Sequence, residues 1–160
     1  MTVIGIDPSV KAPAFAVWPA RATHRIAPLP GNGSDRLCAL YGATKAWAQA
    51  NTPDDLQAVF CEAPFGRYEK KALDQAVGVI TVAMIHGLQH RYPYPVTVFP
   101  IATGTWKKLA LGNGAAKKGA VMDWATANAT QTYGMTQDEA DALAVACAGA
   151  SLLAHGKETP

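Results

Sequence analysis

Four acidic residues that are far apart in this 160-residue sequence have the chemistry needed to hold divalent cations. Asp7 and Glu62 each follow a short apolar run, and Asp138 and Asp141 stand together near the C-terminal end. Carboxylates brought to one point repel one another unless cations lie between them. Mg²⁺ suits such a site because it prefers carboxylate, phosphate and water oxygens. Two Mg²⁺ ions about 3.5–4 Å apart would support in-line hydrolysis of a phosphodiester bond.

The spacing of the last two acids predicts that they act together. Asp138 and Asp141 are three residues apart and would share one face of a helix, whereas Glu139 would point elsewhere. Asp141 lies in a run, residues 140–148, that is otherwise small or apolar. Because burial of an unpaired charge is costly, a purely structural role does not explain this residue.

The other three acids each have an ordinary structural explanation as well. Asp7 precedes a proline and suits a turn, and Glu62 could form an ion pair with a lysine. Asp138 would be favourable in the first turn of a helix. The metal site is therefore a hypothesis about the whole set rather than about any single acid.

The elements that must position these acids follow from apolar patterning and from proline and glycine breaks. Three strands come first, and helices and strands then alternate. This order is typical of an α/β protein with a mixed five-stranded sheet flanked by helices, the ribonuclease H-like architecture. In that architecture the first and fourth strands are neighbours, so the acids that follow them emerge side by side. The sequence predicts strands at 3–6, 13–18, 22–27, 56–61 and 96–99, and helices at 34–50, 68–91, 103–111, 116–131 and 136–154.

Length and composition predict one compact domain. With 49% hydrophobic and 16% charged residues, a chain of this size can bury a core without staples. We expect a single domain over residues 1–155 and a short tail over 156–160. The sequence has no apolar run long enough to span a bilayer and no secretory signal pattern, which favours the cytoplasm and no membrane contact. The three cysteines, Cys38, Cys61 and Cys147, are predicted to be small buried side chains.

The net charge of +2 is unevenly distributed along the chain. Residues 63–122 hold eight basic and two acidic residues, a local charge of +6, so the remainder carries −4. A basic surface beside a cluster of carboxylates indicates a polyanionic partner, although a solvated helix face can produce the same pattern.

Two segments supply most of the basic charge. One straddles a glycine-rich turn at 112–114 that leads into a helix, where ammonium groups and backbone N–H groups can both face phosphates. The other combines aromatic and basic residues directly after Glu62, where a ring such as that of Phe65 could stack on an unpaired base or pack in the core. The lysines of the first segment could also serve solubility alone. The candidate DNA-binding residues are Phe65, Arg67, Tyr68, Lys70, Lys71, Lys107, Lys108, Lys117 and Lys118.

At four places the sequence resembles the RuvC-type Holliday junction resolvases. These are I-G-I-D-P-S at 4–9, Glu62 with Phe65 three residues later, Lys107 followed by G-N-G-A-A-K-K at 112–118, and D-E-A-D-A-L-A-V-A at 138–146. The motifs run in the order of the family and span essentially the whole chain. Ser9 stands where the family usually has glycine, and Ala63-Pro64 replaces longer polar side chains. These departures predict a divergent member, with a phage-encoded one as the hypothesis.

The resemblance implies a metal-dependent endonuclease that nicks two strands of a four-way DNA junction symmetrically. By the resemblance, Asp7, Glu62, Asp138 and Asp141 would be catalytic and would hold two Mg²⁺ ions, with Mn²⁺ as a substitute, and Lys107 and Lys118 would assist. The enzyme would be a homodimer on branched DNA. The rival hypotheses are a different ribonuclease H-like nuclease, acting on flaps or RNA–DNA hybrids, and a non-catalytic junction-binding protein.

The dimer prediction has its own support in the sequence. The helix predicted at 68–91 is apolar around most of its circumference, which indicates that it is largely buried. A single domain of this size has limited room to cover such a helix on all sides, so a second copy is expected to cover part of it. A two-fold dimer would present identical sites to the two equivalent strands of a junction.

Overall fold

The computed structural model describes residues 1–63, 70–92, 96–131 and 133–156 of the chain. Within these ranges it contains five strands and five helices. The strands are β1 (Thr2–Asp7), β2 (Ala14–Trp18), β3 (Ala22–Arg25), β4 (Leu56–Glu62) and β5 (Val98–Ile101). The helices are α1 (Gly33–Asn51), α2 (Lys70–Leu88), α3 (Thr103–Leu111), α4 (Lys118–Asn128) and α5 (Gln137–Ala154).

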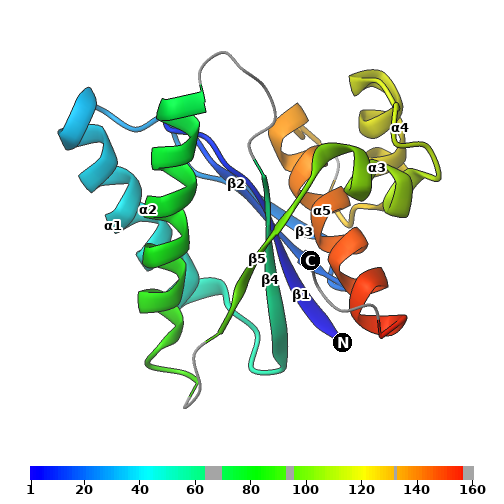
Figure 1. Cartoon of the computed structure of the whole chain (residues 1–160), viewed down its shortest axis with the longest axis horizontal. Coiled ribbons are helices and arrows are strands. Elements are labelled where there is room, and N and C mark those ends of the chain that lie inside the picture. Colours follow the sequence, from blue (N-terminus) through cyan, green and yellow to red (C-terminus); the bar gives the residue numbers. More distant parts are fainter. Residues whose placement is uncertain (64–69, 93–95, 132, 157–160) are drawn as a thin grey trace.

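The strands form one mixed sheet with the order β3-β2-β1-β4-β5 (Figure 1). β1 pairs with β2 and β2 with β3 in the antiparallel sense, whereas β1 pairs with β4 and β4 with β5 in the parallel sense. Antiparallel neighbours need only short turns, while the parallel strands β4 and β5 are joined through α2. Across the described residues, the predicted mixed five-stranded sheet is confirmed.

Helices cover both faces of this sheet (Figure 1). α1 and α2 pack on one face, and α5 packs on the other together with α3 and α4. Side chains alternate along β1, so Val3 joins the α5 side while Ile4 and Ile6 join the α1–α2 side. Asp7 has the parity of Val3 and therefore belongs to the α5 side.

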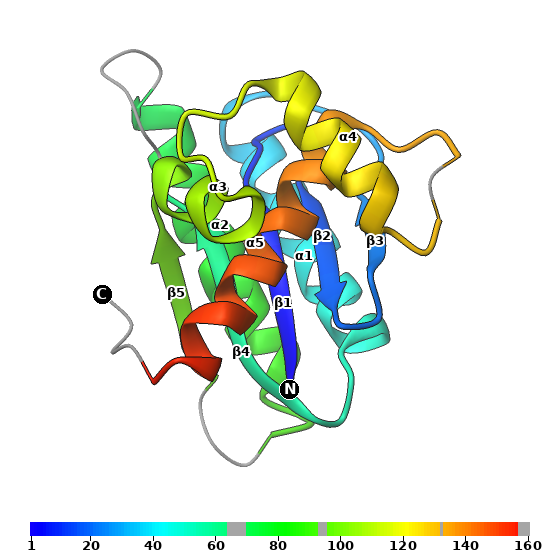
Figure 2. The ribbon, with the colours of Figure 1, turned by 90° about the vertical axis from the view of Figure 1, so that its right-hand side faces the viewer.

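Helix α5 lies across β1 at very short range (Figure 2). Gly5 makes this approach possible, because a Cβ atom there would stand 2.2 Å from the Ala142 carbonyl oxygen and 2.3 Å from the Ala146 nitrogen. Gly149 plays the matching part on α5, where a Cβ atom would stand 2.3 Å from the Phe60 ring. Two glycines thus allow α5, which carries two of the acids, to pack closely on the strands that carry the other two.

The element boundaries differ from the sequence prediction by one to three residues at most ends, and one difference has a clear cause. The predicted strand at 96–99 stops before Pro100, but β5 runs through Pro100 to Ile101. β5 is an edge strand, where a residue without an N–H group costs no ladder hydrogen bond on its open side. The predicted helix at 116–131 is shorter, beginning at Lys118 and ending at Asn128.

Two predictions about burial are wrong in part. The helix predicted at 68–91 was expected to be largely buried, but α2 is an outer helix that buries one side, including Ala76 and Ile80, and leaves Val82 47% exposed. Among the cysteines Cys61 is buried and Cys147 half-buried, but Cys38 is exposed, because it sits on the outer side of α1.

None of the helices in the described ranges has the length and apolar content that crossing a membrane requires.

Candidate metal centre and nucleic-acid interface

Asp7 and Glu62 end neighbouring parallel strands on the α5 side of the sheet. Ile6 of β1 stands opposite Cys61 of β4, so the next residue of each strand brings the two carboxyl groups together. Burial raises the pKa of Asp7 well above its ordinary value of 3.8, and the charge of Glu62 raises it further, followed by those of Asp141 and Asp138 and by a hydrogen bond with Glu62. The charges of the other three predicted acids therefore all act on Asp7.

The N-terminal end of α5 presents the other two acids. Thr136 forms a capping box, in which its side chain accepts a hydrogen bond from the Glu139 N–H and the Glu139 carboxylate accepts one from the Thr136 N–H. Glu139 also accepts a hydrogen bond from Thr23 on β3. The prediction that Glu139 points away from the cluster is confirmed. Its capping role fixes the residue at which α5 begins, and so the positions of Asp138 and Asp141 in the first two turns.

Asp141 is half-buried, and its pKa is raised above the ordinary value of 3.8. Burial raises its pKa to about 6, the charges of Glu62 and Asp138 add to the rise, and a hydrogen bond from Gln137 and the charge of Lys107 oppose it. Gln137 Nε2 donates to Asp141 Oδ1 over 2.8 Å. The effect of Lys107 shows that a predicted DNA-binding lysine of α3 lies near this acid.

Asp138 and Glu62 have partners that the sequence did not indicate. Arg25 Nε on β3 lies 3.2 Å from Asp138 Oδ2. The Thr103 hydroxyl at the start of α3 donates to Glu62 Oε1 over 2.6 Å. The alternative that Glu62 forms an ion pair with a lysine finds no support in the described part of the chain. Neither partner has a sequence signal of its own, because both come from elements that only the tertiary fold brings to the acids.

The donor set fits a hard divalent cation by its chemistry. It consists of carboxylate oxygens from four side chains, and burial, followed by repulsion from neighbouring carboxylates, raises the pKa values of Asp7 and Asp141. In their present side-chain positions, no three His, Cys, Asp or Glu residues of the described ranges are grouped closely enough to hold a metal ion. In these positions Asp138 pairs with Arg25, and Asp141 accepts a hydrogen bond from Gln137.

The predicted basic surface around the glycine-rich turn is present in the described structure. Lys107 is half-buried, with its ammonium group 5.3 Å from the centroid of the Trp106 ring. Lys108, Lys117 and Lys118 are exposed on α3, at the N-cap of α4 and in its first turn. Gly112 ends α3 in the left-handed region at φ 77°, which lets the chain turn sharply towards α4.

The second predicted DNA-binding segment lies mostly outside the described residues. This applies to Phe65, Arg67 and Tyr68, while Lys70 is placed only as the first residue of α2. Lys71 is exposed. In the sequence, the segment lies between Ala63, which follows Glu62, and the start of α2.

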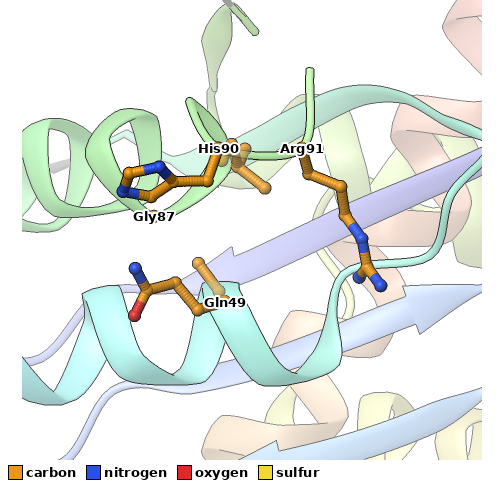
Figure 3. Close-up of a pocket in the computed structure, with 6 residues that line it drawn as sticks. Gln49, Gly87, His90 and Arg91 are labelled. Atoms are coloured by element: carbon orange, nitrogen blue, oxygen red, sulfur yellow. The ribbon is translucent and has the colours of Figure 1, made fainter.

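A cavity of about 340 Å³ between α1 and α2 is not part of this centre (Figure 3). Its Arg91 already has partners, since Nε lies 3.1 Å from Asp54 Oδ1 and the guanidinium donates to the Thr52 carbonyl. Both helices end here, next to the first residues of β4 and β5. Asp7 and Glu62 are the last residues of their strands, so the cavity lies at the opposite end of the strands from the acids. Its lining residues are Ala48, Gln49, Gly87, Leu88, His90 and Arg91.

The described architecture is that of a ribonuclease H-like α/β protein, and comparison with solved structures supports this class. The chain is similar to RuvC of Thermus thermophilus, with a TM-score of 0.76 and 20% identity over 100% of this chain and 99% of that one. It is equally similar to T. thermophilus RuvC in complex with a Holliday junction substrate, with a TM-score of 0.75, 21% identity and the same coverage. The fold is therefore the ribonuclease H-like fold of RuvC. No protein-family profile and no curated protein matches the sequence.

Proposed function

We propose that this protein is a metal-dependent, structure-selective endonuclease that resolves four-way DNA junctions by paired, symmetric phosphodiester hydrolysis. The observation that carries the proposal is geometric: Asp7 and Glu62 end neighbouring parallel strands of a RuvC fold, and α5, which packs on β1, carries Asp138 and Asp141 in its first two turns. The similarity to a RuvC that was solved with a Holliday junction substrate supports the choice of substrate.

The four acids would hold Mg²⁺, or Mn²⁺ in its place, which would supply Lewis-acid activation of water and stabilise the leaving 3′ oxygen. The charge of Lys107 lowers the pKa of Asp141, and Lys107 as a whole is half-buried, so it is suited to neutralise charge on the scissile phosphate. The exposed lysines of the α3–α4 turn would hold the flanking phosphates and orient the strand.

The dimer part of the proposal rests on an apolar groove between α1 and α2. The groove has a volume of about 430 Å³ and is lined by Leu37, Cys38, Tyr41, Gly78, Val79 and Val82. Val82 is 47% exposed, which is unusual for a valine in a packed helix pair. A second copy placed on this surface would cover it and, by two-fold symmetry, would provide one site for each of two equivalent strands.

The proposal is tested with an end-labelled mobile four-way junction beside a linear duplex of the same sequence, with Mg²⁺ or EDTA. Paired symmetric nicks on the junction only, and only with metal, are expected. Equal cutting of linear duplex, or preferred cutting of a flap or an RNA–DNA hybrid, would contradict junction selectivity. Binding of the junction without cutting would identify a non-catalytic junction-binding protein.

A further inference from the structure

The start of α3 is held beside Glu62 by the sheet itself. Glu62 stands opposite Ile101 in the parallel pairing of β4 with β5, and the Ala63 N–H donates to the Ile101 carbonyl over 2.8 Å. α3 begins two residues after Ile101, at Thr103. The position of Thr103 relative to Glu62 is therefore set by backbone hydrogen bonds rather than by a mobile loop.

Thr103 makes a short, charge-assisted hydrogen bond to Glu62. Its hydroxyl donates to Oε1 over 2.6 Å, in the range of hydroxyl–carboxylate bonds, which are stronger than neutral ones. The bond engages one carboxylate oxygen and so restricts rotation of the carboxylate plane. The same carboxylate lies beside Asp7, whose pKa is raised by burial and further by the charge of Glu62 and a hydrogen bond with it.

The same helix reaches a second acid. Lys107 follows Thr103 by four residues and so lies on the same face of α3. The charge of Lys107 lowers the pKa of Asp141 on α5. One face of α3 thus presents two groups to the acids: a hydroxyl that donates to Glu62 and an ammonium group whose charge acts on Asp141.

We propose that Thr103 is a positioning residue, whose hydroxyl fixes the Glu62 carboxylate for divalent cation binding and is not needed for DNA binding. The inference rests on the proposed metal-dependent function and adds to it a residue that the sequence did not single out. Hydrogen-bond partners of metal-binding side chains typically contribute about 10–100-fold to metal affinity or activity.

The test measures Mn²⁺ and Mg²⁺ binding to the full chain by isothermal titration calorimetry, and junction binding in EDTA by gel shift. Thr103→Val keeps the branched shape and removes the donor, so we expect at least about tenfold weaker cation binding with unchanged junction affinity. Thr103→Ser keeps the hydroxyl and should remain within about threefold of wild type. Thr105→Val is the matched control, because Thr105 is exposed on the same helix.

Cation binding by Thr103→Val equal to that of wild type would overturn the inference, and so would equal losses in Thr103→Ser and Thr103→Val. Should Thr103→Val fail to fold by circular dichroism, Thr103→Ala removes the donor without the extra methyl group and takes its place. A wild-type protein that binds cation and loses it in Thr103→Val, yet cuts no junction, would refute the proposed substrate and leave the inference standing. A wild-type protein that binds no cation would overturn both.

Discussion

The two faces of the sheet differ in side-chain size and in chemistry, although the same strands build both. Where α5 crosses β1, the α5 face is packed by small residues such as Ala142 and Ala146 against Gly5, with large side chains such as Trp106 further out. The α1–α2 face is filled by large side chains, among them Trp47 and Met84. All four acids belong to the α5 face, and the apolar groove belongs to the outer surface of the other layer.

The difference follows from strand alternation. Along β1, the side chains that face α5 include Asp7, the last residue of the strand. Ile4 and Ile6 face the other way and are entirely buried. Asp7 and Glu62 thus end strands on the face where glycines allow the closest approach of a helix to the sheet. We therefore assign chemistry to the α5 face and association to the α1–α2 layer, and each assignment can be tested separately.

The largest effect is expected from Asp7→Asn. It should reduce junction cleavage to below about one-thousandth of wild type while junction binding persists, because the basic surface is untouched. It should also raise the Tm of the metal-free protein, since a neutral amide removes a charge that both burial and the neighbouring carboxylates disfavour, the two causes that raise the pKa of Asp7. Asp123→Asn, at an exposed acid on α4, is the matched control for cleavage assays and differential scanning calorimetry. Retention of substantial cleavage by Asp7→Asn would refute the site.

The next largest effect is expected from Gly5→Ala. The added Cβ atom would overlap α5 backbone atoms at 2.2–2.3 Å, so we expect a loss of about 3 kcal/mol or more in the free energy of unfolding. Gly42→Ala in α1 has open space around its Cβ position and should stabilise the protein by about 0.5–1 kcal/mol. Urea denaturation of both variants compares the two faces directly, and equal stabilities would contradict the close packing.

A smaller effect is expected from Val82→Glu in the groove. A charge buried in the dimer interface should raise the dimer dissociation constant at least about tenfold, which corresponds to about 1.4 kcal/mol. Gln75→Glu places the same charge at an exposed position of α2 outside the groove lining and should leave the constant unchanged. Analytical ultracentrifugation measures both constants. An unchanged dimer in Val82→Glu would place the interface elsewhere.

The last prediction concerns the pH dependence of stability. Folding raises the pKa of Asp141 from 3.8 to about 6, so the folded protein binds this proton more tightly than the unfolded chain. Asp141 therefore costs stability as pH rises from about 4 to about 6, and the cost stays constant above that. In EDTA, Asp141→Asn should be more stable than wild type at pH 7 and converge with it towards pH 4, as measured by urea titrations. A stability difference that does not change with pH would contradict the raised pKa.

The strand order and the four acids could be predicted because both depend on local patterns. Short apolar runs that end in Asp7 and Glu62 specify strands and the positions of their last residues, and the helix at 136–154 is marked by its cap. That the acids form one metal centre stays a prediction, as do the roles of Lys107 and Lys118.

The partners of the acids could not be predicted, for a physical reason. Arg25 and Thr103 reach Asp138 and Glu62 only through sheet order and helix placement, and nothing in their own sequence neighbourhoods marks them. The role of Gly5 was missed in the same way, because a glycine in a strand has many explanations until a helix is seen against it.

The most direct test uses mixed dimers, formed by refolding wild-type protein together with Asp7→Asn. These are added to a supercoiled plasmid that carries an extruded cruciform. Wild type alone should linearise the plasmid by paired nicks. Each mixed dimer has one working centre on its α5 face. We therefore expect mixed dimers to convert the plasmid to nicked circles, which accumulate as the variant fraction rises. Linear product that merely falls in proportion to the wild-type fraction, without nicked circles, would contradict a symmetric dimer with one centre per subunit.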